Sequence, residues 1–169
     1  MTTKRVFFAL WPDHRQRDRL RDVVNSVARN VEGKAVDRRN WHITLAYVGD
    51  IDERLIPELQ QRANEIKLVP FRLSFDRLEY WARPKVACLM TPTVPTELEK
   101  LVLDLHAVIQ DVGVIPEDRT YRPHITVSRN ARAFTTERLA QRETTEWSRF
   151  QLMESISAPG GVSYVPLKQ

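Results

Sequence analysis

The tripeptide His-Ile-Thr occurs twice in this chain, at residues 42–44 and 124–126, in a sequence with only four histidines. The first copy lies in WHITLAYVG (41–49) and the second in PHITVSR (123–129), 82 residues further along the chain. Each copy begins an apolar stretch that is typical of a buried β-strand. Because successive side chains of a strand point to opposite faces, the histidine and the threonine of each copy share one face. Each copy therefore predicts a strand with one face in the core and an imidazole and a hydroxyl on the other.

The segments around the two tripeptides also follow one another in the same order. A β-forming stretch over 4–10 and a helix-like spacing of apolar residues over about 13–30 precede the first copy. Residues 88–92 and a second helix-like stretch over about 96–112 precede the second copy. A strand–helix–histidine-strand order written twice indicates an internal duplication.

We therefore predict an α+β fold that is bilobal, a pseudo-two-fold duplication of strand–helix–strand units. Its antiparallel sheets would face a central cleft where equivalent residues of the two lobes meet. The chain is expected to form a single domain over 1–169, with pseudo-repeat halves of approximately 1–81 and 82–169.

Several further elements are expected from periodicity and turn signals. A helix is predicted over about 52–66, although Pro57 leaves its start open. A weaker helical segment is predicted over about 135–142. The remaining predicted strands are 33–37, 71–81, 85–91, 150–157 and 163–167.

Composition narrows the class of protein. Hydrophobic residues make up 42% of the chain, enough for a packed core, yet no run approaches the roughly 18 apolar residues of a membrane span. The short apolar stretch near the N-terminus ends at Pro12 and does not resemble a secretory signal. A single cysteine, Cys88, excludes an internal disulfide and a cysteine-rich zinc site. We expect a cytoplasmic protein with no membrane association, and no obligate protein partner is indicated.

The paired tripeptides suit the chemistry of phosphodiester cleavage. One group must take a proton from the nucleophile and another must give one to the leaving oxygen, and histidine serves both tasks near neutral pH. His42 and His124 are therefore candidate catalytic residues. The hydroxyls of Thr44 and Thr126 could donate to the non-bridging phosphate oxygens. A net charge of +4 is compatible with such an anionic partner.

Metal-ligand patterns are missing from the sequence. It contains no His-x-His pair, no cysteine cluster and no His-Glu-x-x-His helix. We therefore expect neither a metal site nor a cofactor.

HITL at 42–45 and HITV at 124–127 resemble the paired His-x-Thr-x signature of the two-histidine phosphoesterases. Together with RVFFAL at 5–10, WHITLAYVGD at 41–50 and YRPHITVSR at 121–129, they resemble the branch of RNA 2′,3′-cyclic phosphodiesterases. That branch was historically named 2′-5′ RNA ligase. The resemblance covers nearly the whole chain in the same order.

This resemblance implies hydrolysis of a terminal 2′,3′-cyclic phosphate of RNA to a 2′-phosphomonoester without a metal. It implies that His42 is the general acid, which protonates the departing 3′-oxygen, and that His124 is the general base, which activates water. A 5′-hydroxyl in place of water would give 2′-5′ ligation through the same transition state. The expected partners are RNA ends or cyclic nucleotides.

Arg129 closes the second motif, where family members often carry a basic residue, and is a candidate phosphate contact. Strict alternation would point it away from His124, although it lies at the end of the strand, where the chain could turn. Two other readings stay open at this point. One is a phosphodiesterase that acts on other cyclic or 2′-5′-linked nucleotides, and the other is a non-catalytic RNA-binding module.

Overall fold

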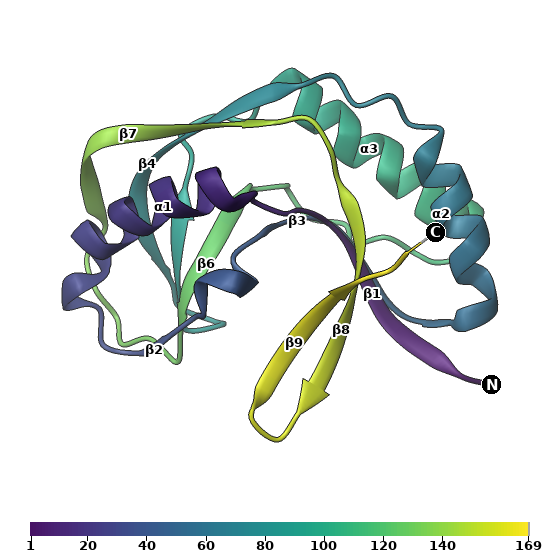
Figure 1. Ribbon diagram of the computed structural model, residues 1–169, viewed down its shortest axis with the longest axis horizontal. Helices are drawn as coiled ribbons and strands as arrows, with labels where there is room; N and C mark the ends of the chain where they lie inside the picture. Colours follow the sequence, from purple (N-terminus) through teal and green to yellow (C-terminus); the bar gives the residue numbers. More distant parts are fainter. Residues whose placement is uncertain (169) are drawn as a thin grey trace.

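The computed structural model describes residues 1–168, which form two antiparallel sheets and three α-helices (Figure 1). The helices are α1 (His14–Val27), α2 (Ile56–Asn64) and α3 (Thr96–Asp111). The strands are β1 (Thr3–Leu10), β2 (Lys34–Ala35), β3 (Ile43–Asp52), β4 (Phe71–Trp81), β5 (Val86–Met90), β6 (His124–Arg129), β7 (Glu137–Trp147), β8 (Gln151–Ala158) and β9 (Gly161–Pro166).

The first sheet has the strand order β3-β1-β8-β9 and the second has the order β2-β6-β5-β4-β7. The structure confirms the predicted α+β class with antiparallel sheets. Each sheet takes strands from both halves of the chain, because β4 joins the second sheet and β8 and β9 return to the first. The repeat boundary near 81 and 82 stays a prediction about the sequence.

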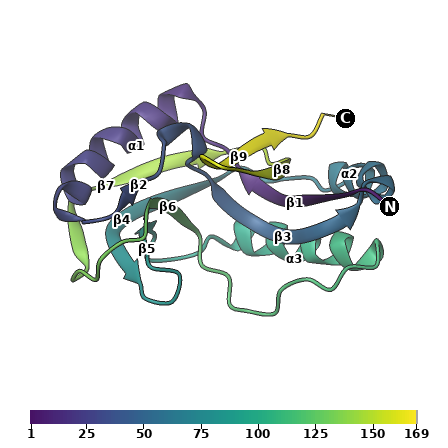
Figure 2. The same cartoon turned by 90° about the horizontal axis from the view of Figure 1, so that it is seen from below.

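The helices lie against the sheets as amphipathic elements. In Figure 2, α2 and α3 lie on one side of the first sheet, and α1 lies beside β7 of the second. Asp13 caps α1 by accepting from the backbone N–H of Gln16, whose side chain in turn accepts from the backbone N–H of Asp13. Helix α3 covers almost all of the stretch predicted over about 96–112, and Pro95 holds its N-cap position.

The segment around 135–142 was predicted to be helical, and this prediction is wrong. Residues Glu137–Trp147 form strand β7, which pairs with β4 from Phe71 opposite Trp147 to Leu78 opposite Glu137. Most of β7 is exposed, and apart from Leu139 and Ala140 its side chains before Trp147 are charged or polar, so the sequence shows no apolar alternation there. Pairing with β4 therefore stabilises a strand here and outweighs the weak helical preference of the local sequence.

The main core gathers the apolar faces of both sheets and of the helices. It contains Ile43 and Leu45 of the first motif and Ile125 and Val127 of the second, as their strand positions predicted. Two smaller apolar clusters lie apart from it, one on each sheet. The first consists of Phe7, Ala9 and Met153 with Trp11 and Tyr164, and the second of Val86, Cys88 and Met90 with Trp81. None of the helices in residues 1–168 is long and apolar enough to cross a membrane.

Candidate active site

The two histidines are held by the same backbone contact. Nδ1 of His42 lies 2.7 Å from the carbonyl oxygen of Asn40, at the end of a 3₁₀ turn (Arg38–Asn40). Nδ1 of His124 lies 2.8 Å from the carbonyl oxygen of Arg122. A carbonyl oxygen only accepts, so each ring donates from Nδ1. The contact fixes the tautomer of both neutral rings and leaves Nε2 of each free to exchange a proton.

Aromatic side chains pack on both imidazoles. Trp11 stacks parallel to His42 with ring centroids 4.8 Å apart and an interplanar angle of 1°. Tyr164 of β9 and Phe7 of β1 lie 5.0 and 5.3 Å from the same ring. Trp81, at the end of β4, lies 4.3 Å from the ring of His124 at an angle of 45°. The two apolar clusters therefore surround the two histidines.

Burial lowers the pKa of both histidines, because the charged imidazolium loses its hydration. The pKa of His42 falls to about 4, and the positive charges of His124 and Arg129 act in the same direction. The pKa of His124 falls below its usual 6.5 for the same main reason, with Arg122 and Arg119 adding to it. Both imidazoles are thus predominantly neutral at pH 7 before an anion binds.

A β-bulge follows the threonine of each motif at the same position. In the first motif Ala9 pairs with Thr44 and Phe8 with Ala46, so that Leu45 is skipped. In the second, Cys88 pairs with Thr126 and Ala87 with Ser128, so that Val127 is skipped. A bulge places two residues opposite one and re-aims the side chains that follow.

The second bulge explains the position of Arg129. Strict alternation would point this residue away from His124, but after the bulge both side chains line one cavity together with Thr126. Tyr47 stands at the corresponding position of the first motif and lines the same cavity. Sequence analysis missed Tyr47 in this role.

The cavity lies between the two motif strands and has a volume of about 740 Å³. Thr44 lines it from β3, opposite the residues of β6. His42 is not part of its lining; this half-buried ring packs against Trp11, Phe7 and Tyr164. The charge of His124 nevertheless acts on His42, and β3 and β6 contact each other. The structure therefore gathers four of the five residues predicted from the sequence, Thr44, His124, Thr126 and Arg129, in one cavity. It places His42 outside the lining of that cavity but close enough for the charges of His124 and Arg129 to act on it.

Tyr121 joins the two motifs. Its hydroxyl donates to the carbonyl oxygen of Thr44 over 2.9 Å, and burial raises the pKa of its phenol, which stays protonated. The loop that leads into β6 is thereby tied to β3.

Two further observations concern the Cys88 thiol and the groups that could bind a metal ion. The Cys88 thiol lies 3.8 Å from the Thr126 hydroxyl, and burial raises its pKa to about 11, so it is not a reactive thiolate. Within residues 1–168, no three His, Cys, Asp or Glu side chains are grouped as ligands of a metal ion.

Comparison with known proteins gives consistent matches. Residues 10–88 match the model of the LigT-like phosphoesterases. The RNA 2′,3′-cyclic phosphodiesterase of Escherichia coli K12 is 30% identical over 81% of this chain and 78% of its own. That of Archaeoglobus fulgidus is 24% identical over 97% of this chain and 98% of its own.

Solved structures agree over almost the entire length. The apo form of E. coli LigT has a TM-score of 0.87 at 27% identity, with 99% of this chain and 96% of that chain covered. LigT complexed with 3′-AMP has the same TM-score and identity.

Proposed function

Because the chain belongs to the LigT-like phosphoesterase family, we propose that it hydrolyses the terminal 2′,3′-cyclic phosphate of RNA to a 2′-phosphomonoester. The observation that carries this proposal is the matched pair of imidazoles. Each is bound at Nδ1 by the carbonyl two residues earlier and is accompanied by a threonine on the same strand face. Two such groups meet the need for one base and one acid.

In the proposed reaction, Nε2 of His124 takes a proton from water as the water oxygen forms its bond to phosphorus. The bond from phosphorus to the 3′-oxygen breaks, and Nε2 of His42 donates a proton to that oxygen. The assignment of acid and base follows the family. The low pKa of His42 makes its protonated form a strong acid, and the phosphodiester anion beside it stabilises that form before the reaction.

Three further side chains would hold the phosphate. The hydroxyls of Thr44 and Thr126 donate to the non-bridging oxygens, and the guanidinium of Arg129 compensates the charge that develops on them. All three line the same cavity, which supports this assignment. The substrate is therefore an RNA end, bound with its phosphate between the two motifs.

The test is a reaction of the protein with an oligoribonucleotide that ends in a 2′,3′-cyclic phosphate, in the presence of EDTA. Phosphorus NMR distinguishes a 2′-phosphate from a 3′-phosphate product, and a reaction without protein is the control. We expect a 2′-phosphate. A 3′-phosphate would contradict the assigned leaving oxygen, and no turnover would contradict the proposed function.

A further inference from the structure

The cavity extends beyond the residues that would hold the phosphate. Part of its lining is the arginine arm, which we define as Arg83, Arg119, Arg122 and Trp81. Arg83 lies in the turn between β4 and β5, and Arg119 and Arg122 belong to the loop that leads into β6. These two segments meet beside His124. None of the arm residues has been assigned a part in the proposed reaction.

The arginine arm carries an excess of positive charge. Arg122 pairs with Glu79 at 2.9 Å, and it shares this carboxylate with Arg77, which lies 3.1 Å from Glu79 and 2.9 Å from Asp76. Arg119 pairs with Glu117 at 2.8 Å. Arg83 is exposed and forms no ion pair with any residue in 1–168. Glu117 lines the cavity as well, so an anion in this part of the cavity would meet the unpaired guanidinium of Arg83 beside two paired arginines.

The arginine arm also contains a flat surface, formed by the Trp81 ring and the Arg122 guanidinium. The guanidinium carbon of Arg122 lies 5.1 Å from the centroid of the Trp81 ring, and the ring of His124 lies 4.3 Å from it. The surface thus continues from the histidine out to the arginine. Aromatic rings and arginine planes are surfaces on which nucleobases stack, irrespective of the base.

The two sides of the site differ in the room they leave for a polynucleotide. On the side of His42, the rings of Trp11, Phe7 and Tyr164 cover the imidazole. On the side of His124, the cavity of about 740 Å³ opens along the arginine arm. A site of this size lies in the upper part of the range of about 300–1,000 Å³ that is usual for ligand pockets. The arginine arm therefore offers an RNA chain a basic path out of the cleft.

We propose that the arginine arm binds the nucleotide on the 5′ side of the terminal cyclic phosphate, with its base on the Trp81–Arg122 surface and its phosphodiester beside Arg83 and Arg119. The inference rests on the proposed function and extends it. The protein selects oligonucleotide ends over mononucleotide cyclic phosphates, because only an oligonucleotide reaches the arm.

The experiment compares kcat/KM for adenosine 2′,3′-cyclic phosphate with that for the dinucleotide ApA ending in a 2′,3′-cyclic phosphate. We expect the unmodified protein to prefer the dinucleotide by about tenfold or more, since only the dinucleotide can form charge-assisted contacts with the arm. The double variant Arg83→Gln, Arg119→Gln should reduce this ratio at least fivefold. A higher salt concentration should also reduce the preference of the unmodified protein for the dinucleotide.

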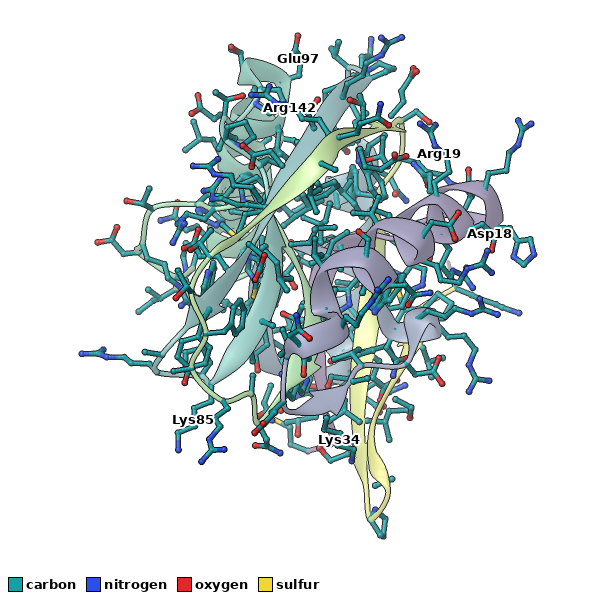
Figure 3. All side chains as sticks on the ribbon, turned by 90° about the vertical axis from the view of Figure 1, so that its left-hand side faces the viewer. Asp18, Arg19, Lys34, Lys85, Glu97 and Arg142 are labelled. Atoms are coloured by element: carbon teal, nitrogen blue, oxygen red, sulfur yellow. The ribbon has the colours of Figure 1, made fainter. Side chains whose placement is uncertain are left out.

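Arg142→Gln is the matched control, because Arg142 is an exposed arginine of β7, at the opposite edge of the second sheet from β2. In Figure 3, Arg142 lies near the top of the view and Lys85, two residues after Arg83, near the bottom. This variant should keep the ratio of the unmodified protein. Two results would overturn the proposed role of the arginine arm. One is equal kcat/KM of the unmodified protein for the two substrates, and the other is a double variant that loses the same factor of kcat/KM on both substrates. No hydrolysis of either substrate by the unmodified protein would overturn the proposed function, and the arm with it.

Discussion

His42 and His124 have the same hydrogen bond and different surroundings. Each donates from Nδ1 to a backbone carbonyl, but three aromatic rings cover His42, whereas His124 has Trp81 on one side and the open cavity on the other. The greater loss of hydration at His42 lowers its pKa to about 4. The neighbouring side chains therefore make His42 and His124 different, although both occur in the same tripeptide.

The pH dependence of hydrolysis follows from these pKa values. The reaction needs one neutral and one protonated imidazole, so kcat/KM, which reports the free protein, should be bell-shaped. Both pKa values lie below 6.5, that of His42 at about 4, so the maximum should fall on the acidic side of pH 6.5. This holds whichever histidine carries the proton. In kcat, the bound phosphate anion raises both pKa values and moves the bell to higher pH.

Initial rates between pH 4 and pH 9, at low and at saturating substrate, would check this. A profile of kcat/KM that is flat through this range, or that rises steadily above pH 7, would contradict two titrating histidines with lowered pKa values.

The catalytic candidates could be predicted from the sequence, and their surroundings could not. A repeated His-Ile-Thr at the head of two apolar strands indicates the paired groups directly. Trp11 meets His42 because β1 pairs with β3, with Leu10 opposite Ile43. Tyr164 meets His42 only because β8 returns to β1 and brings β9 with it. This second contact depends on strand pairing over more than a hundred residues, which no local pattern encodes.

The strands β3 and β6 position the site through their bulges. Each bulge follows the motif threonine directly, keeps Leu45 or Val127 in the core, and turns the residue two positions later toward the cavity. Arg129 lines the same cavity as His124 for this reason. Alternation alone predicted the opposite direction, because a bulge depends on the partner strand as well as on the strand that carries it. Residues Glu137–Trp147 likewise form strand β7 because they pair with a partner strand, β4.

Strand β2 holds the outer edge of β6, and Gly33 allows their close approach. A Cβ at this position would lie 2.6 Å from the Ser128 hydroxyl and 3.0 Å from backbone atoms of Ala131 and Arg129. We expect Gly33→Ala to reduce the free energy of unfolding by about 1–3 kcal/mol, because the backbone next to the motif must shift. Urea denaturation measures this change.

Gly160→Ala is the control for that prediction, since no atom lies within 4 Å of a Cβ built there. It should leave the free energy of unfolding within about 0.5 kcal/mol of the unmodified protein. Equal stabilities of the two variants would show that the approach of β2 to β6 is not as tight as described.

The molecule as a whole is two sheets joined by one core, with a cleft between the motif strands. The apolar residues of both motifs pack in that shared core, so the strands that carry the histidines cannot move independently. Tyr121 adds a direct bond across the cleft, from the loop before β6 to the carbonyl of Thr44 in β3.

Removing that bond should weaken the junction. We expect Tyr121→Phe to lower the free energy of unfolding by about 0.5–1.5 kcal/mol, the usual contribution of one hydrogen bond. The variant should also lower kcat, because Thr44 is then held less firmly opposite Thr126. Urea denaturation and initial rates measure the two effects, and Tyr47→Phe, a more exposed tyrosine with no side-chain hydrogen bond in residues 1–168, serves as the stability control. A variant as stable as that control would contradict the bridging role.

The central claim is that His42 and His124 act together as one acid–base pair, and the most direct measurement is the turnover of His42→Ala, His124→Ala and the double variant. The substrate is an oligoribonucleotide ending in a 2′,3′-cyclic phosphate, and circular dichroism establishes that each variant is folded. If the two residues form one unit, each single variant loses nearly as much activity as the double variant, and the losses do not add. A folded single variant that retains substantial turnover, or losses that multiply in the double variant, would contradict the claim.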